Sequence, residues 1–348
     1  MNYEIDFLPV GNGDKSGDAI CLRWEEANQY KVMVIDGGTK ESGEKIVDHI
    51  LKYYRTKTVD YVVNTHPDQD HASGLSIVLE KLTVKELWIH RPWNYTKEII
   101  AHFNDGRITE KSLKERLEKS FSYVKPLEDI AIEKKITIKE PYQGKQIGIF
   151  EVLSPSKDWY LHDLIPDFNK TPDKKEKYEV ATEGFVEKVL NWILESMDNE
   201  TLKTDGTTSS DNESSVILYS KIKEKGILLT GDAGSKALNK AFSYKNDLSE
   251  NLGFIQVPHH GSRNNVNPDI LNKILGDKGQ EEESKTAFIS ASKDSSKHPR
   301  QSVVNAFIRR GCKVVQTKGE SKRHRRGTPD REGWSTAEQL PFKKKFQE

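Results

Sequence analysis

The sequence is short of cysteine, of long apolar runs and of any excess charge of one sign. Its two cysteines, Cys21 and Cys312, cannot make a disulfide framework, and both lie in strand-like runs, so we expect buried free thiols. No apolar run approaches the roughly 18 residues of a membrane-spanning helix, and no signal peptide is evident. These absences predict a cytoplasmic protein with no membrane partner. Because Lys plus Arg and Asp plus Glu are equal at 54 each, net charge gives no reason to expect nucleic-acid binding.

What the sequence does contain is a cluster of residues that bind metal ions. The strand-like run Val59–Val63 leads into His66-Pro67-Asp68-Gln69-Asp70-His71, so four metal-capable side chains follow a buried strand closely. Imidazole nitrogens and carboxylate oxygens are ligands of borderline and hard divalent ions, and two of each can serve two ions. The alternative is a polar loop in which Asp68 or Asp70 caps the next helix, but a cap needs only one such residue.

Three later stretches each place polar residues just after an apolar strand. Residues 226–230 end on Gly231-Asp232, residues 254–257 lead to His259-His260, and residues 287–291 are followed at a short distance by His298. Open α/β sheets collect their ligands at the carboxyl ends of strands. Each stretch is weak evidence alone, and their order behind the histidine–aspartate loop indicates a metal site.

Together these motifs resemble those of the metallo-β-lactamase-fold hydrolases, most closely the metallohydrolase domain of the ComEC group of DNA-uptake channels. The sequence departs from the superfamily pattern in two places. Asp68 stands where the loop usually has its second histidine, as in the ComEC group, and residues 210–215 stand where a further histidine is expected. The matching stretches, in order, are Val10–Asp14, Gly17–Ile20, Val34–Gly38, Thr65–His71, Asn212–Val216, Thr230–Asp232, Val257–Ser262 and His298–Pro299.

The resemblance implies an α/β fold, the αββα sandwich of the metallo-β-lactamases, with helical insertions in a single domain over residues 1–348. Residues 93–134 form a charged helical insertion, residues 154–213 form a second insertion with an amphipathic helix near Val186–Met197, and residues 318–348 are a basic carboxy-terminal segment. Helices are also expected at Gly43–Tyr54 and Leu75–Leu82. Strands are expected at Tyr3–Val10, Ala19–Trp24, Lys31–Ile35, Val59–Asn64, Glu86–Ile89, Ile136–Lys139, Gln146–Leu153, Ser215–Lys221, Gly226–Thr230, Phe254–Val257, Thr286–Ser290 and Lys313–Thr317.

The residue types predict a site for two divalent ions, Zn or Mn. One ion is expected to take His66 and Asp68, and the other Asp70 and His71 with one of the two adjacent histidines, while Asp232 bridges the pair. A hydroxide held between the ions would be the nucleophile. We take His259 as the ligand and assign catalytic roles to Asp70, His260 and His298, although the pattern fits either order of the adjacent histidines.

Further residues are expected around the metals. Asp36 would orient a ligand histidine, or would equally serve as a turn residue before two glycines. Asn212 and Ser214 stand where the superfamily histidine is missing. Ser262 and Arg263 could hold an anion at a turn or helix start.

The substrate is the least constrained part of the interpretation. The basic run near the carboxy terminus is either a solvated segment or a patch that tracks phosphates. Its nucleic-acid contacts would be Lys322, Arg323, Arg325 and Arg326. We therefore expect a metal-dependent phosphodiesterase or nuclease. The alternatives are a hydrolase of a small ester, lactone, thioester or cyclic nucleotide, and a binding protein with a catalytically weak site. The oligomeric state stays open.

Overall fold

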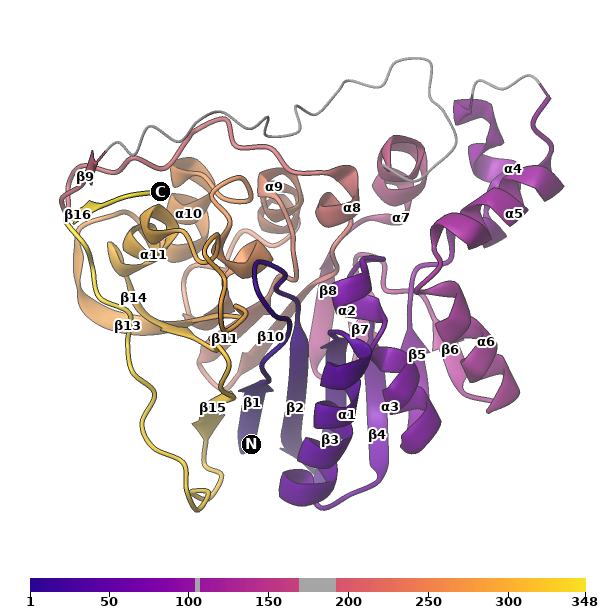
Figure 1. Ribbon diagram of the computed structural model, residues 1–348, viewed down its shortest axis with the longest axis horizontal. Coiled ribbons are helices and arrows are strands. Elements are labelled where there is room, and N and C mark those ends of the chain that lie inside the picture. The colour runs from indigo at the N-terminus through magenta and orange to yellow at the C-terminus, as the bar shows by residue number, and fades with distance from the viewer. Residues whose placement is uncertain (104–106, 169–191) are drawn as a thin grey trace.

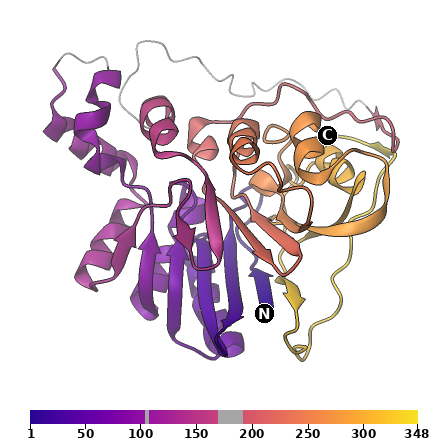
Figure 2. The same cartoon turned by 180° about the vertical axis from the view of Figure 1, so that it is seen from behind.

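The computed structural model describes residues 1–103, 107–168 and 192–348. Two seven-stranded sheets pack face to face, and helices cover the outer face of each sheet (Figures 1 and 2). This four-layer arrangement is the αββα sandwich that the motifs imply, so the predicted fold class is confirmed.

The first sheet is mixed. Its central strands β3, β4, β5 and β6 are parallel, β2 is antiparallel to β1 and β3, and β15 pairs antiparallel with β1 at the edge. The carboxyl ends of β3 and β4 therefore lie at one edge of the sheet. In spatial order the strands are β15 (Lys322–Arg326), β1 (Tyr3–Phe7), β2 (Ala19–Glu26), β3 (Gln29–Gly37), β4 (Thr58–Val63), β5 (Thr83–Trp88) and β6 (Thr137–Lys139).

The second sheet is also mixed, with parallel strands on one side and antiparallel strands on the other. Strands β11 to β14 are parallel, and β10, β8 and β7 continue the sheet as antiparallel neighbours. In spatial order the strands are β14 (Arg310–Gln316), β13 (Gln280–Ile289), β12 (Leu252–Gln256), β11 (Lys225–Leu229), β10 (Ile217–Ile222), β8 (Phe150–Ser154) and β7 (Gln146–Ile147). A separate small sheet pairs β9 (Ile193–Leu194) with β16 (Lys345–Phe346).

Helices fill the two outer layers and the first insertion. Those of the first half are α1 (Lys40–His49), α2 (Gln69–Ala72), α3 (Leu75–Lys81), α4 (Thr96–Ile99), α5 (Glu110–Ser120), α6 (Lys125–Glu133) and α7 (Lys157–Trp159). Those of the second half are α8 (Ser210–Glu213), α9 (Ser235–Tyr244), α10 (Pro268–Leu275) and α11 (Gln301–Ile308). Short 3-10 or π turns lie at Ile50–Tyr54, Pro92–Asn94, Ile100–His102, Tyr160–Leu164, Ile165–Asp167 and Pro258–Gly261.

The apolar residues form two kinds of core. Side chains such as Ile5, Leu22 and Phe254 fill the space between the sheets, whereas residues such as Val78 and Ile270 pack helices onto the outer sheet faces. Because both faces of each sheet are covered, the strands read as nearly continuous apolar runs. The polar residues that follow the strands are thereby left at the open edge.

Two predicted elements differ from the structure. Gln146–Leu153 is not one strand but a hairpin of β7 and β8, because Gly148 adopts a positive φ of 59° between them. The helix expected near Val186–Met197 begins outside the described residues. Its described part is wrong as a helix, since Ile193 and Leu194 form β9 and pair with β16 from the chain's end.

The basic carboxy-terminal segment is part of the fold. β15 extends the first sheet beyond β1, and Arg331 follows it to reach Asp6, with Nη1 and Nη2 each 2.8 Å from a carboxylate oxygen. Arg323 and Arg331 both pair with Glu4, which is fully buried. A buried ion pair that loses one partner leaves an uncompensated charge in the interior. The segment's arginines therefore neutralise acidic residues of β1.

We expect Arg331→Gln to lower the free energy of unfolding by roughly 3 kcal/mol, because Asp6 and Glu4 would keep their charges without this partner. Urea unfolding followed by circular dichroism would measure the loss. Arg326→Gln is a matched control, since Arg326 ends the same strand on the exposed side and should shift stability by less than about 0.5 kcal/mol. Equal stability of the two variants would mean that the segment contributes nothing to folding.

Candidate metal centre

Loops from both sheets meet at the carboxyl ends of the central strands. Asp36 lies at the end of β3, His66 and His71 follow β4, Asp232 follows β11, and the histidine pair follows β12. A close backbone approach between Gly37 and Gly74 positions these loops. A Cβ at Gly74 would lie 2.0 Å from the Gly37 carbonyl oxygen, so only glycine lets α3 start against β3. The sheets thus bring together residues that are far apart in sequence.

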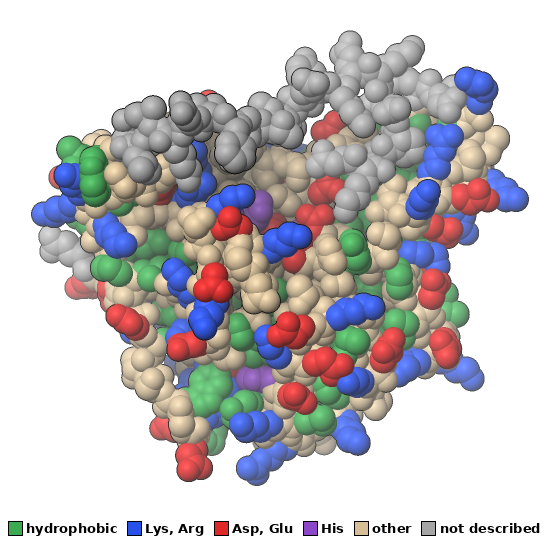
Figure 3. Space-filling model, viewed as in Figure 1, with side chains coloured by type: hydrophobic (Ala, Val, Ile, Leu, Met, Phe, Trp, Pro, Cys, Tyr) green, Lys and Arg blue, Asp and Glu red, His purple; other side chains and the backbone are tan. Residues whose placement is uncertain are grey.

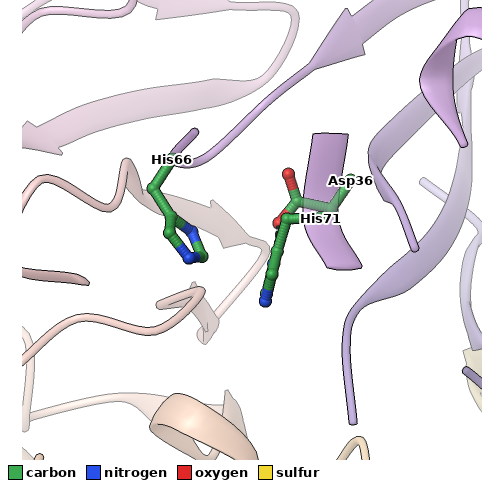
Figure 4. Close-up of side chains that lie close together, drawn as sticks. All are labelled: Asp36, His66 and His71. Atoms are coloured by element: carbon green, nitrogen blue, oxygen red, sulfur yellow. Dashed lines mark hydrogen bonds and ion pairs between the residues drawn. The ribbon is translucent and has the colours of Figure 1, made fainter. Parts of the chain in front are cut away.

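Asp36 organises the first half of the site. Its Oδ1 accepts a hydrogen bond from the Thr65 amide at 2.8 Å, and its Oδ2 accepts from the Thr65 hydroxyl at 2.6 Å and from His71 Nδ1 at 2.8 Å. The Thr65 oxygen in turn lies 3.0 Å from His66 Nδ1 and accepts from it. Figure 4 shows the Asp36 carboxylate beside the His71 ring, with the His66 ring extending in the same direction. Both Nε2 atoms are therefore left as lone-pair donors.

The second half of the site is organised in the same way by backbone and amide groups. His260 Nδ1 donates to the Ser290 carbonyl at 2.9 Å. The Asn265 amide nitrogen donates to the Asp232 carbonyl at 2.8 Å, so its oxygen faces His259 Nδ1 at 2.8 Å and accepts from it. These bonds fix the tautomers with Nε2 unprotonated in the neutral rings. All four imidazoles thus present the same atom.

The four Nε2 atoms converge on Asp232. The distances from its Oδ2 are 3.8 Å for His66, 3.4 Å for His71, 3.6 Å for His259 and 3.6 Å for His260. The Nε2 atoms of His66, His71 and His260 and the Oδ1 of Asp232 are buried without a hydrogen-bond partner among the described residues. Buried polar atoms without partners are costly unless something binds them. These donors fit divalent metal ions, with Asp232 between the two groups of histidines.

Asp68 and Asp70 complete the donor set from the loop after β4. Asp68 is at the N-cap position of α2 but its side chain makes no capping hydrogen bond, and its Oδ2 lies 3.7 Å from His66 Nε2. Asp70, His71 and His260 bring donor atoms within 4.8 Å of one another. His66 and Asp68 would hold one ion, and Asp70 and His71 the other, with the bridging carboxylate between them.

The geometry favours His260 over His259 as the second ion's ligand, the reverse of the order taken from the sequence. The His260 side chain is 4% exposed and is grouped with Asp70 and His71, whereas the His259 side chain is 28% exposed at the mouth of the site. The reason lies in the backbone, because His259 and His260 both have positive φ, 45° and 57°. This uncommon left-handed turn sends the second ring inward, and sequence patterns do not reveal it.

Asp18 is a site residue that received no role from the sequence. It is buried, its Oδ2 lies 3.8 Å from His71 Nδ1, and it accepts a hydrogen bond of 2.8 Å from Gln256 Nε2. The same Gln256 accepts from the amides of Thr230 and Gly231, directly before Asp232. The only signal was the Gly17-Asp18 match within the family resemblance. Asp18 and Gln256 therefore connect β2 to the Asp232 loop.

The pKa values of the site residues are those expected where a metal ion and protons compete for the same atoms. Burial opposes ionisation of Asp232, but His71, His259 and His260 outweigh it and hold the pKa of that carboxyl well below its usual value. Burial also opposes protonation of His71, yet Asp232 and Asp36 raise the pKa of its imidazole well above normal. Burial lowers the pKa of His260 to about 3. A cation entering the site would displace a proton from His71, so affinity should rise with pH.

His298 lies beside the two adjacent histidines. Its ring centroid is 5.9 Å from that of His259 and 6.4 Å from that of His260, and its Nδ1 is buried without a partner among the described residues. Burial, followed by the nearby His259, lowers the pKa of His298 to about 4. The ring is therefore neutral at pH 7 and can offer one N–H to an anion without carrying charge.

Of the remaining predicted residues, some lie at the site and others make contacts elsewhere. Asn212 belongs to the site, with Nδ2 3.3 Å from His259 Nδ1. Ser214 instead donates to the Asp211 carbonyl at 2.6 Å, which closes a turn, so it offers no donor to a substrate. Ser262 Oγ accepts from the Asn264 amide, and Arg263 extends to Glu348 at 4.0 Å. Of the turn or helix start expected here, the structure has a turn at Arg263 and Asn264, and the next helix, α10, begins at Pro268.

The four basic residues of β15 differ in their partners and in their exposure. Arg323 is committed to Glu4, to the Thr328 hydroxyl and to the Pro329 carbonyl, and its side chain is 6% exposed. Lys322 pairs with Glu320 at 2.8 Å, and Arg325 pairs with Asp330. Arg323 is thus held by its buried pairing with Glu4, whereas Lys322 and Arg325 pair with exposed carboxylates. Arg326 is exposed at the strand's end.

Comparisons with known proteins agree with this fold. Residues 27–148 match the family described as the metallo-beta-lactamase superfamily. ComE operon protein 3 of Bacillus subtilis is 22% identical over 329 residues, which cover 90% of this chain and 32% of that protein. The chain thus spans about a third of the relative's length.

Solved structures with a similar arrangement include two that span nearly the whole chain. Tm1679, described as a metal-dependent hydrolase of the beta-lactamase superfamily, has a TM-score of 0.44 at 14% identity and covers 94% of this chain and 100% of its own. YhfI of Bacillus subtilis, described as a metallo-beta-lactamase fold protein, has a TM-score of 0.40 at 8% identity, with coverage of 93% and 100%. Within the described residues, no helix combines the length and apolarity needed to cross a bilayer.

Proposed function

We propose that this chain, which has the metallo-β-lactamase fold, is a two-metal phosphodiesterase acting on DNA or RNA. The observation that carries the proposal is the convergence of four imidazole Nε2 atoms on the buried Asp232 carboxylate. Without bound cations this arrangement would be costly, because three of those buried nitrogens have no hydrogen-bond partner among the described residues.

The donor set supports a phosphodiester substrate over a carbonyl one. Bound divalent ions would activate a water and stabilise negative charge on the attacked centre. Asp68 and Asp70 make the site richer in carboxylate oxygen than an all-histidine pocket, which suits Mn as well as Zn and therefore phosphate oxygens. The family resemblance to a DNA-uptake group points to the same substrate class.

The chain's own residues have defined tasks in this proposal. Asp36, Asn265 and the Ser290 carbonyl keep the ligand rings oriented through their Nδ1 atoms. His298 would donate its N–H to a phosphate oxygen rather than act as a general acid, since an imidazole with a pKa of about 4 holds little proton at pH 7. His259, at the mouth, would contact the leaving group.

The charged side chains on the face in Figure 3 are mixed in sign, so a polyanion would be attracted at particular sites and not by the whole surface. Lys and Arg side chains alternate there with Asp and Glu, and no broad area of one sign is visible. Steering by a uniform basic face is therefore not part of the proposal. Nucleic acid would be held mainly at the metals and by nearby neutral donors such as Asn212.

A substrate panel tests the proposal. We expect protein loaded with Mn or Zn to cleave labelled single- or double-stranded DNA, or RNA, and bis(p-nitrophenyl) phosphate. The same preparation should leave p-nitrophenyl acetate and a simple lactone nearly untouched. Elemental analysis of the purified protein gives the metal content in parallel. Ester or lactone hydrolysis without phosphodiester cleavage would replace this function with the small-substrate alternative, and tight metal binding without any hydrolysis would favour the binding protein.

A further inference from the structure

A hollow separate from the metal centre lies at one side of the sandwich. β14 and β15 are the edge strands of the two sheets on the same side, so the gap between the sheets opens there. The loop after β15 contributes residues from the stretch 330–337 to this opening, and Figure 1 shows the chain turning below β15 and then running past β13 and β14 to β16. The hollow has a volume of about 650 Å³, within the usual range of small-molecule sites.

The walls of the hollow carry an excess of cationic side chains. Lys313 comes from β14 and has no ion-pair partner among the described residues, while Lys322 and Arg325 come from β15. Among the described residues the last two form ion pairs with Glu320 and Asp330, which are 76% and 91% exposed, and Arg325 also donates to the Thr328 carbonyl. Exposed ion pairs contribute only about 0–1 kcal/mol, so either cation can turn to a ligand at little cost.

The floor beneath these cations is not anionic. The buried Glu4 and Asp6 of β1 do not line the hollow, and three guanidinium groups, those of Arg23, Arg323 and Arg331, pair with them. Arg323 and Arg331 also line the hollow. Arg323 Nε is buried and has no hydrogen-bond partner among the described residues, so one donor of the floor is unused. Charge and unused donor both favour an anion.

We propose that this hollow binds a polyphosphate group, either free or as part of a nucleotide. Lys313, Lys322 and Arg325 all line this one hollow, and compact multivalent oxyanions are the ligands that several cations around one site recognise. Charged residues on edge strands also discourage edge-to-edge pairing of sheets. That role does not require cations from two different sheets to line one hollow. The site is independent of the proposed hydrolysis.

Titration calorimetry with pyrophosphate, ADP and adenosine tests the site. The protein would be stripped of metal by chelation and carry Asp232→Asn, so that anions cannot be held through ions at the catalytic centre. We expect pyrophosphate and ADP to bind and adenosine not to bind. Lys313→Gln with Arg325→Gln should weaken both by at least about tenfold, the loss expected for a strong charge-assisted contact.

A matched control separates a built site from diffuse charge. Lys221→Gln with Lys223→Gln removes two positive charges from the hairpin between β10 and β11 and should leave affinity unchanged. Thermal unfolding should show both double variants folded, because all four side chains are at least partly exposed. Absence of pyrophosphate binding, or equal weakening in the two double variants, would overturn the proposal. Binding of ADP but not pyrophosphate would overturn the polyphosphate assignment.

Discussion

Asp232→Asn should reduce the rate of phosphodiester cleavage by about a thousandfold or more, the largest effect of any single substitution in this protein. A bridging carboxylate offers an anionic oxygen to each ion, whereas an amide offers one neutral oxygen and an N–H that repels a cation. A thousandfold loss is about 4 kcal/mol of transition-state stabilisation. Steady-state rates on bis(p-nitrophenyl) phosphate at saturating Mn would measure it.

The substitution is nearly isosteric, so folding is not expected to fail. The Asp232 backbone stays fixed by its amide's hydrogen bond to Ser215 Oγ and by the Asn265 amide on its carbonyl. Asp18→Asn is the informative comparison, because Asp18 is equally buried near His71 but faces Gln256. We expect a smaller loss there. More than about a tenth of the wild-type rate in Asp232→Asn would mean that Asp232 is a turn residue and does not bridge.

The sequence predicted that these side chains cluster because they follow strands in a fixed order. Apolar strands at residues 59–63 and 226–229 end on polar residues, and parallel strands bring such ends to one edge of a sheet. His66 and Asp232 could therefore be placed together without coordinates. The prediction needed only strand positions and the rule that connects them.

Other features depended on contacts that no local pattern encodes. β15 pairs with β1 across more than 300 residues, with Tyr3 opposite Arg326, so a basic run that reads as a solvated segment became an edge strand. Because this pairing places Arg323 next to the buried Glu4, the two side chains form an ion pair. The inward turn of His260 depends on positive φ angles at two histidines, for which residue type gives no indication. Long-range pairing and backbone strain set these outcomes.

Asp70→Ala combined with His71→Ala should remove one of the two ions and nearly all hydrolysis. Both side chains belong to the group that also includes His260, so the second ion would keep only that imidazole and its share of Asp232. One imidazole and a shared carboxylate are too few ligands to hold a divalent ion tightly. Elemental analysis after dialysis should give about half the wild-type metal content, and activity should fall by at least about a hundredfold.

The double variant must be distinguished from a misfolded protein. His71 is buried, but Asp36 keeps three donors without it, the Thr65 amide, the Thr65 hydroxyl and the Asn64 side chain. Asp158→Ala with His162→Ala removes the same residue types from an exposed pair 3.8 Å apart and should change neither metal content nor rate. Asp70→Asn alone tests the same ligand set with less disturbance and should also lower metal content. Full metal binding and full activity in Asp70→Ala/His71→Ala would place the metals elsewhere, because no two-metal arrangement at this centre can dispense with both donors.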